Sequence, residues 1–290
     1  MTSLGMVIRP HVPPEQLTAI ARVADDAGLE QLWLWEDSFF AGSIAQSAAV
    51  LAATERVRVG VGVIPVPFRN VGLLAMEIAA LDRMFPGRFI TGVGHGSQGW
   101  MGQAGARVPS PMTLLREYVD ALRALLRGEK LTVEGTYVNL TDVQLTWPPA
   151  TPLPVLLGAT GPRTVRLAGE IGDGTVLDAQ YTAEGVRKQR ALIEEGHATA
   201  GRTDPHELVV FVTAVTGPDA QERYRAEMAE WSHDPAAGIG VAGDAGEIAN
   251  ALNAIVDAGA DTVIVVPVGS EPDLPGFARF IAQDVRPLVR

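Results

Sequence analysis

The nonapeptide DAGLEQLWL (residues 26–34) resembles a second stretch near the other end of the chain, DAGADTVIV (residues 257–265). A looser copy, LAGEIGDGTVL, occupies residues 167–177. Each copy predicts a helix that closes on a glycine and is followed by a short buried strand. Glycine suits this position because the backbone just after a helix often adopts a positive φ. Recurring helix–strand units of this kind predict an α/β protein with a parallel sheet.

Eight short apolar segments are expected to form the strands. Most of them are apolar throughout rather than alternating, which is typical of parallel strands buried on both faces. Because helical segments mostly separate them, they predict a closed (β/α)8 TIM barrel, with an open doubly wound sheet as the alternative. The expected strands are 4–8, 31–35, 57–63, 88–94, 154–158, 173–177, 207–213 and 261–266.

The connection between the fourth and fifth strands is longer than the others and predicts an insertion. It contains a helix near 112–127, a small hairpin over 131–138 and a run of prolines that ends at Pro154. The chain shows no linker and no low-complexity segment. We therefore expect one barrel domain over residues 1–290.

Composition excludes several classes of function. The net charge of −11 disfavours nucleic acid and anionic membrane surfaces as partners. The absence of cysteine excludes thiolate metal sites and thiol nucleophiles, and the five scattered histidines indicate no metal site. There is no apolar run long enough to span a membrane and no signal peptide at the start, so we expect a cytoplasmic protein.

Barrel enzymes carry their active sites at the carboxyl ends of the strands, and the segment after the fifth strand suits a phosphate. Its glycines allow a ligand to approach the backbone, and Pro162 suits the first position of a helix. Amide groups at such a helix start can hold a phosphate beside Arg163, although a plain tight turn is the alternative. The phosphate-binding residues would be Gly158, Ala159, Thr160, Gly161 and Pro162.

The segment after the fourth strand, GHGSQG (residues 94–99), matches the dinucleotide fingerprint G-x-G-x-x-G. Neither an amphipathic helix nor a strand ending in an acidic residue follows it, so classical dinucleotide binding is rejected. We interpret Gly94 and Gly96 as a floor beside a planar ring. His95 would then point into the pocket, with a structural histidine as the alternative. Serine catalysis is disfavoured, since His197 and His206 are expected to be solvated.

Asp37 directly follows the second strand, which places it at the barrel mouth. Half-buried acids at such positions often transfer protons or orient a ring. A helix cap or a loop hydrogen bond is the alternative. Nearby aromatic side chains are expected to wall an apolar pocket, unless they belong to the core: Trp35, Phe39, Phe40 and Trp100.

Taken together, these segments resemble the bacterial-luciferase-like flavin and deazaflavin oxidoreductases. They are most similar to the branch that uses coenzyme F420, such as methylenetetrahydromethanopterin reductase and F420-dependent glucose-6-phosphate dehydrogenase. The resemblance runs through nearly the whole chain and rests on the order and spacing of its pieces. These are WED (35–37), FRN (68–70), ALDRMFPGRF (80–89), GVGHG (92–96), PVLLG (154–158) and AGEIGDG (168–174).

The resemblance implies a deazaflavin at the barrel mouth and a hydride transfer to or from a small, largely apolar organic substrate. It places Asp37 at the ring edge and a non-prolyl cis peptide bond at Gly62–Val63 behind the ring. Gly94, His95, Gly96 and Ser97 would flank the ring, and residues 158–162 would hold the phosphate. The acid or base role falls to Asp37 or His95. A homodimer is the family-level expectation.

Two departures from the family pattern make sugar-phosphate oxidation doubtful. Ser38 stands where the sugar-phosphate dehydrogenases carry a catalytic histidine, and Ser97 replaces an acidic residue. The main alternative keeps the fold but uses FMN, as a two-component monooxygenase that receives reduced flavin from a reductase partner. A non-catalytic flavin carrier and a barrel enzyme without a redox cofactor rank lower.

Overall fold

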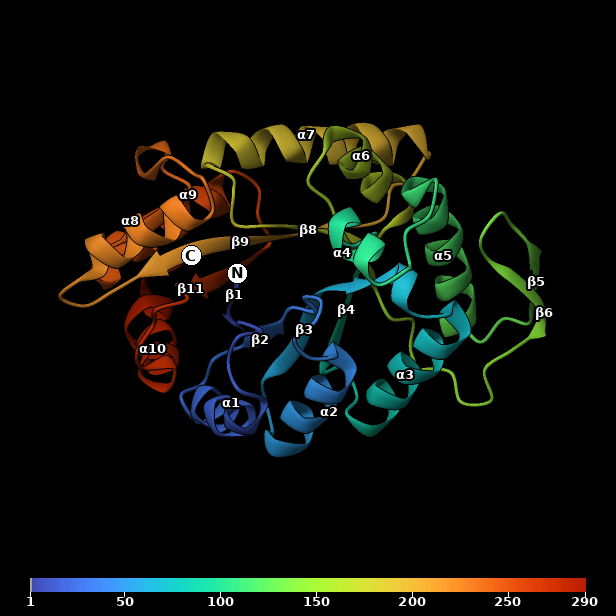
Figure 1. Cartoon of the computed structure of the whole chain (residues 1–290), viewed down its shortest axis with the longest axis horizontal. Coiled ribbons are helices and arrows are strands. Elements are labelled where there is room, and N and C mark those ends of the chain that lie inside the picture. Colours follow the sequence, from blue (N-terminus) through green and yellow to red (C-terminus); the bar gives the residue numbers. More distant parts are fainter. Residues whose placement is uncertain (1) are drawn as a thin grey trace.

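The computed structural model describes residues 2–290 and shows a closed barrel of eight parallel strands. Neighbouring strands pair in the order β1-β2-β3-β4-β7-β8-β9-β11, and β11 pairs with β1 to close the ring (Figure 1). The predicted (β/α)8 fold is therefore confirmed. The barrel strands are β1 (Ser3–Ile8), β2 (Gln31–Leu34), β3 (Arg58–Pro65), β4 (Phe89–Gly94), β7 (Val155–Gly158), β8 (Gly174–Leu177), β9 (Glu207–Val215) and β11 (Thr262–Pro267).

Helices surround the barrel and cover the outer faces of its strands (Figure 1). Across residues 2–290, none of them combines the length and apolar character that crossing a bilayer requires. The α-helices are α1 (Leu17–Asp26), α2 (Ser43–Ala53), α3 (Val71–Met84), α4 (Gln98–Gln103), α5 (Pro111–Leu126), α6 (Pro162–Ile171), α7 (Ala183–Thr199), α8 (Ala220–Glu230), α9 (Ala245–Asp257) and α10 (Leu274–Phe280).

The repeated helix–glycine–strand unit forms as predicted in two of its three copies. Gly28 and Gly259 follow α1 and α9 with φ of +85° and +108°, a region that favours glycine. In the third copy Gly169 lies inside α6 instead. A Cβ there would come within 2.2 Å of the Ile193 carbonyl oxygen on α7. This glycine therefore allows two helices to pack closely rather than ending one.

The barrel interior is filled by a layer of large side chains that closes it below the mouth. Trp33 and Phe211 pack edge to face there, with ring centroids 5.5 Å apart. The interior is thus a packed core, and space for a ligand lies at the strand ends. The buried members of this layer are Val7, Trp33, Ile90, Leu156, Val176, Val209, Phe211, Ile264 and Val266.

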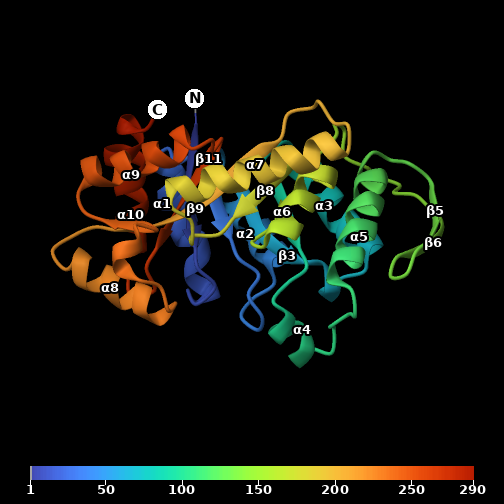
Figure 2. The ribbon, with the colours of Figure 1, turned by 90° about the horizontal axis from the view of Figure 1, so that it is seen from above.

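The insertion between β4 and β7 contains the predicted helix, α5, and the predicted hairpin. The hairpin strands are β5 (Leu131–Glu134) and β6 (Asn139–Val143), and both lie outside α5 (Figure 1). The second strand lies entirely beyond the expected range of 131–138. Two further elements were not predicted. They are the short helix α4 and the strand β10 (Gly240–Ala242), which pairs in parallel with the carboxyl end of β9. In Figure 2, α4 and α8 lie on the side opposite the two termini.

Asp25, at the end of α1, anchors the loop that leads into β3. Its carboxylate accepts hydrogen bonds from the backbone amides of Glu55, Arg56 and Val57, at 2.8, 3.0 and 2.7 Å. Burial alone would raise the pKa of Asp25, but these amides together lower it. The ionised carboxylate therefore stabilises the fold.

Replacing Asp25 by asparagine is expected to reduce the free energy of unfolding by about 2 kcal/mol, since an amide cannot accept all three bonds. Because the folded-state pKa lies below the unfolded one, this contribution is present above pH ~4 and disappears as the pH falls further. Urea unfolding at several pH values measures it. The exposed neighbour Asp26, changed to asparagine, is the control; an equal effect of both variants would contradict the anchoring role.

Candidate active site

Two adjoining cavities lie at the carboxyl ends of the barrel strands. Their volumes are about 310 and 480 Å³, and Gly62, Asp178 and Phe211 line both. The smaller one brings together most of the predicted cofactor-binding residues. Its walls are Gly62, Val63, Gly94, His95, Gly96, Ser97, Gly158, Ala159, Thr160, Val176, Asp178 and Phe211.

Val63 occupies the space that the predicted glycine floor leaves free. The pairing of β3 with β4 is interrupted between Val61 and Ile64, and the Gly62–Val63 peptide bond is cis, as the resemblance implied. A Cβ on Gly94 or on Gly158 would lie 2.7 Å from a methyl group of Val63. The expectation of a bare backbone floor is therefore corrected, because the two glycines make room for this side chain.

Replacing Gly158 by alanine is expected to lower the free energy of unfolding by about 1–3 kcal/mol, because the new methyl group overlaps Val63. The double variant Gly158→Ala, Val63→Ala removes the overlap and should regain part of that loss. Gly161→Ala is the matched control, since nothing lies within 4 Å of the Cβ it would add. Denaturant unfolding measures all three, and equal effects at positions 158 and 161 would contradict the packing argument.

Helix α6 begins beside the smaller cavity. Gly161 is its N-cap residue and Pro162 its first residue, and no side chain caps this helix start. The Tyr181 hydroxyl donates a hydrogen bond of 2.8 Å to the Thr160 carbonyl, which fixes the loop before it. Gly161 and Pro162 directly follow Thr160 in the sequence but are not among the residues that line the cavity. An uncapped helix start has free amides and a positive dipole end, which suit an anion.

His95 lines the smaller cavity and is oriented by its own loop. Its Nδ1 lies 2.9 Å from the Gly96 carbonyl oxygen, which can only accept a hydrogen bond. The hydrogen therefore lies on Nδ1 in the neutral ring, and Nε2 carries a free lone pair. In this state His95 is suited to accept a proton at Nε2.

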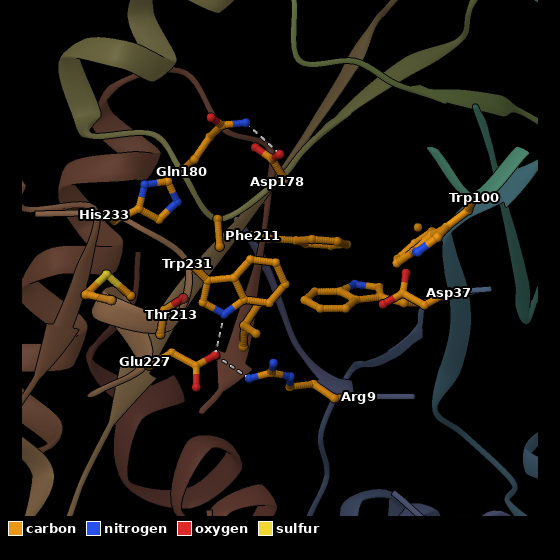
Figure 3. Close-up of a pocket in the computed structure, with 15 residues that line it drawn as sticks. Arg9, Asp37, Trp100, Asp178, Gln180, Phe211, Thr213, Glu227, Trp231 and His233 are labelled. Atoms are coloured by element: carbon orange, nitrogen blue, oxygen red, sulfur yellow. Dashed lines mark hydrogen bonds and ion pairs between the residues drawn. The ribbon is translucent and has the colours of Figure 1, made fainter. Parts of the chain in front are cut away.

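Asp37 lines the larger cavity together with Trp35, and it lies beside Trp100 (Figure 3). Burial raises the pKa of its carboxyl, and the Arg9 guanidinium partly opposes this shift. A carboxyl poised in this way is suited to proton transfer. Phe39 and Phe40 were expected to wall the same pocket, which is wrong: they are 64 % and 60 % exposed because the loop turns them outward.

Sequence reasoning missed the group of charged and aromatic residues on the far side of the larger cavity. Arg9 forms a buried ion pair with Glu227, and the indole nitrogen of Trp231 donates to the same carboxylate at 2.9 Å (Figure 3). The Gly269 amide donates to the other oxygen of Glu227 at 2.9 Å. The guanidinium of Arg9 lies between Trp35 and Trp231, 6.0 and 5.9 Å from their ring centroids.

Asp178 was also missed, although it directly follows β8, whereas Asp37 lies three residues after the end of β2. Its Oδ2 accepts a hydrogen bond of 2.7 Å from the Gln180 side chain, and its Oδ1 is buried without a partner within residues 2–290. Burial raises the pKa of Asp178. The rule that pointed to Asp37 would have identified Asp178 and Arg9, since both follow barrel strands. Glu227 and Trp231 belong to or follow α8, and no sequence signal marked them.

Several residues of the motifs that carry the family resemblance do not line the two cavities but stabilise the structure around them. Arg69 forms an ion pair of 2.6 Å with Glu36 and thereby joins the loops after β3 and β2. Asn70 caps α3 by accepting a hydrogen bond from the Gly72 amide at 2.8 Å. Arg69 and Asn70 therefore fix loops that carry the site. Arg88, by contrast, lies at the amino ends of β3 and β4, where it donates to the backbone carbonyls of Thr54 and Val57.

His197 and His206 pack together, with ring centroids 5.9 Å apart. Nε2 of His206 lies 2.9 Å from the Thr175 hydroxyl, and burial lowers the pKa of His206 to about 4. The expectation that both histidines are solvated is wrong, because this loop packs beneath the amino ends of β8 and β9. Within residues 2–290, no cluster of three or more histidine or acidic side chains is placed to hold a metal ion.

A (β/α)8 barrel with paired cavities at its mouth, lined by glycines, aromatic rings and three carboxyl groups, has the site of a small-molecule enzyme. The chain belongs to the luciferase-like monooxygenase family, whose pattern it matches over residues 2–273. The resemblance inferred from the motifs is thereby confirmed.

Two curated relatives come from the branch that uses coenzyme F420. The 5,10-methylenetetrahydromethanopterin reductase of Methanolobus tindarius is 30 % identical to this chain, over 73 % of this chain's length. The F420-dependent glucose-6-phosphate dehydrogenase of Microbacterium testaceum is 29 % identical to it, over 71 % of this chain's length. The matches span 64 % and 66 % of those proteins, less than two thirds of their length.

Solved structures share the fold over the whole chain. A coenzyme F420-dependent tetrahydromethanopterin reductase from Methanopyrus kandleri has a TM-score of 0.84 at 22 % identity and covers 100 % of this chain and 99 % of its own. An F420-dependent secondary alcohol dehydrogenase reaches a TM-score of 0.88 at 21 % identity, with the same coverage. An FMN complex of the 3,6-diketocamphane monooxygenase of Pseudomonas putida reaches 0.80 at 16 % identity, again with 100 % and 99 % coverage.

Proposed function

We propose that the chain is an oxidoreductase that binds a deazaflavin, coenzyme F420, in the smaller cavity. It would transfer a hydride between this cofactor and a small, largely apolar organic substrate held in the larger cavity. The observation that carries the proposal is that Gly62, Asp178 and Phe211 line both cavities, because a cofactor in one and a substrate in the other would then be adjacent. The F420-dependent relatives support the choice of cofactor.

The residues present fit a flat, phosphorylated cofactor. The combined space lies within the range of about 300–1,000 Å³ that is typical of small-molecule sites. Three buried polar atoms at the walls of the cavities lack a partner within the described chain, which is expected where a ligand is to bind. They are Arg9 Nε, Trp35 Nε1 and Asp178 Oδ1. The uncapped start of α6 would hold the phosphate, and residues 94–97 would flank the ring.

When bound, the cofactor supplies a two-electron hydride transfer. The chain's own residues then have three tasks. The indoles of Trp35 and Trp100 exclude water from the larger cavity, which strengthens electrostatic interactions inside it. The Asp37 carboxyl holds or releases the proton that accompanies the hydride, and His95 can accept one at Nε2.

Titration of the purified protein with coenzyme F420 and, separately, with FMN tests this proposal. We expect deazaflavin to bind with micromolar affinity and to change its fluorescence. FMN binding without deazaflavin binding would instead favour the two-component monooxygenase, since the start of α6 suits the phosphate of either cofactor. Oxygen consumption that depends on an added flavin reductase would identify that alternative.

A further inference from the structure

The larger cavity carries an unusual charge balance for a largely apolar pocket. Its lining includes three carboxyl groups, those of Asp37, Asp178 and Glu227, but one guanidinium, that of Arg9, and no lysine among these residues of the described chain. The only other basic side chain that lines it is His233. The carboxyl groups that line the cavity therefore outnumber its basic side chains.

Arg9 forms its ion pair with Glu227, and within residues 2–290 no ion pair joins it to Asp37 or Asp178. Both side chains are buried, at 9 % and 6 % exposure, and the pair is completed by the Gly269 amide and the Trp231 indole. Arg9 also reaches the Pro267 carbonyl oxygen at 3.4 Å. Arg9 and Glu227 thus neutralise each other in a hydrogen-bonded unit.

Asp37 and Asp178 are influenced by the charges of Arg9 and His233, respectively, but neither forms a direct ion pair in the part of the chain that the structure describes. None of the ion pairs within residues 2–290 involves either of them. Figure 3 shows them on two sides of the same cavity, Asp37 beside Trp100 and Asp178 beside Gln180. A partly buried carboxylate without a direct ion-pair partner is costly, so a positively charged ligand would stabilise both groups.

The aromatic walls favour the same kind of ligand. Trp35 stacks on Phe211 with centroids 5.8 Å apart, and Trp100 and Trp231 complete the enclosure. The faces of these rings are negative, and two of them already hold the guanidinium of Arg9. Aromatic faces combined with free carboxylates are how proteins bind organic cations.

We propose that the substrate held in this cavity is an organic cation, such as a protonated amine, an iminium or a quaternary ammonium compound, with Asp37 and Asp178 as the specificity-determining residues. This inference rests on the proposed function, because it assigns the larger cavity to the substrate. It excludes phosphorylated and carboxylated substrates, which would meet two unpaired carboxylates.

Three para-substituted benzyl alcohols of similar shape, whose hydroxyl group does not ionise near neutral pH, test the proposal by isothermal titration calorimetry. They carry a trimethylammonio, a tert-butyl or a sulfonate group, and therefore differ mainly in charge. At pH 8, where histidine side chains are ordinarily neutral, we expect the cation to bind at least about tenfold more tightly than the neutral compound. The sulfonate should bind most weakly.

Variants assign the preference to the two carboxyl groups. Asp178→Asn and Asp37→Asn should each lower the ratio of cation to neutral affinity about fivefold. Asp178→Glu retains the charge and should retain most of the ratio, and the exposed Asp26→Asn is the control. An unchanged affinity for the neutral compound shows that the cavity is intact in each variant.

Equal or tighter binding of the neutral compound or the sulfonate by the wild-type protein would overturn the inference, as would failure of all three to bind at millimolar concentration. So would variants that leave the ratio unchanged. The cofactor titration is scored separately. Deazaflavin binding without a charge preference overturns this inference alone, whereas a charge preference without binding of any flavin or deazaflavin overturns the proposed function.

Discussion

Asp37→Asn is expected to lower kcat/KM for the cofactor-dependent reaction by about 10²–10⁴-fold. The carboxyl group lies in the larger cavity at the barrel mouth, and the amide that replaces it cannot hold or release the proton that accompanies a hydride. Deazaflavin affinity should change by no more than a few-fold, because no covalent or ionic bond to the cofactor is lost. Loss of deazaflavin absorbance with an oxidisable amine or alcohol measures turnover.

The pH profile separates proton transfer from a structural role. Burial raises the pKa of Asp37, so the acidic inflection of kcat/KM should lie above the ordinary aspartate range near pH 4 and should vanish in Asp37→Asn. Asp26→Asn is the control. If the double variant Asp37→Ala, His95→Ala keeps full turnover, neither residue transfers the proton.

Glu227→Gln is expected to lower the free energy of unfolding by about 3–5 kcal/mol, the largest stability effect that we predict. The substitution leaves the Arg9 guanidinium buried without its carboxylate. It also weakens the hydrogen bonds that the Gly269 amide and the Trp231 indole donate to Glu227. Equilibrium unfolding in urea at pH 7 provides the measurement.

The double variant Arg9→Met, Glu227→Gln tests whether the loss comes from an unpaired charge. Removing both charges of a buried pair is often nearly neutral, so the double variant should be more stable than Glu227→Gln alone. Burial alone would raise the pKa of Glu227, but its hydrogen bonds and Arg9 lower it, so the pair stabilises the fold above pH ~4 and loses this effect as the pH falls. A cost below ~1 kcal/mol for the single variant would mean that water reaches Arg9.

Local sequence patterns were sufficient to predict the barrel. Glycines after α1 and α9 and continuous apolar strands are signals contained within a few residues, and the strand bounds agree to within two residues. The bulge at Gly62–Val63 followed from the family resemblance and not from physical reasoning. The helix α4 was missed because its six residues include two glycines and give no amphipathic pattern.

The site was predicted in part, for a physical reason. Strand ends are marked in the sequence, so Asp37 and His95 could be placed at the mouth, and the same rule extended to the first and sixth barrel strands would have found Arg9 and Asp178. The packing of Val63 into the glycine gaps depends on three strands at once. Likewise, the pairing of Arg9 with Glu227 joins residues 218 positions apart, which no local pattern encodes.

A crystal structure of the protein grown with coenzyme F420 tests the central claim most directly. We expect the deazaflavin ring in the cavity between Val63 and His95, one face toward the larger cavity, and its phosphate within hydrogen-bonding distance of the first amides of α6. A ring bound elsewhere on the chain, or a phosphate that makes no contact with the start of α6, would contradict the account.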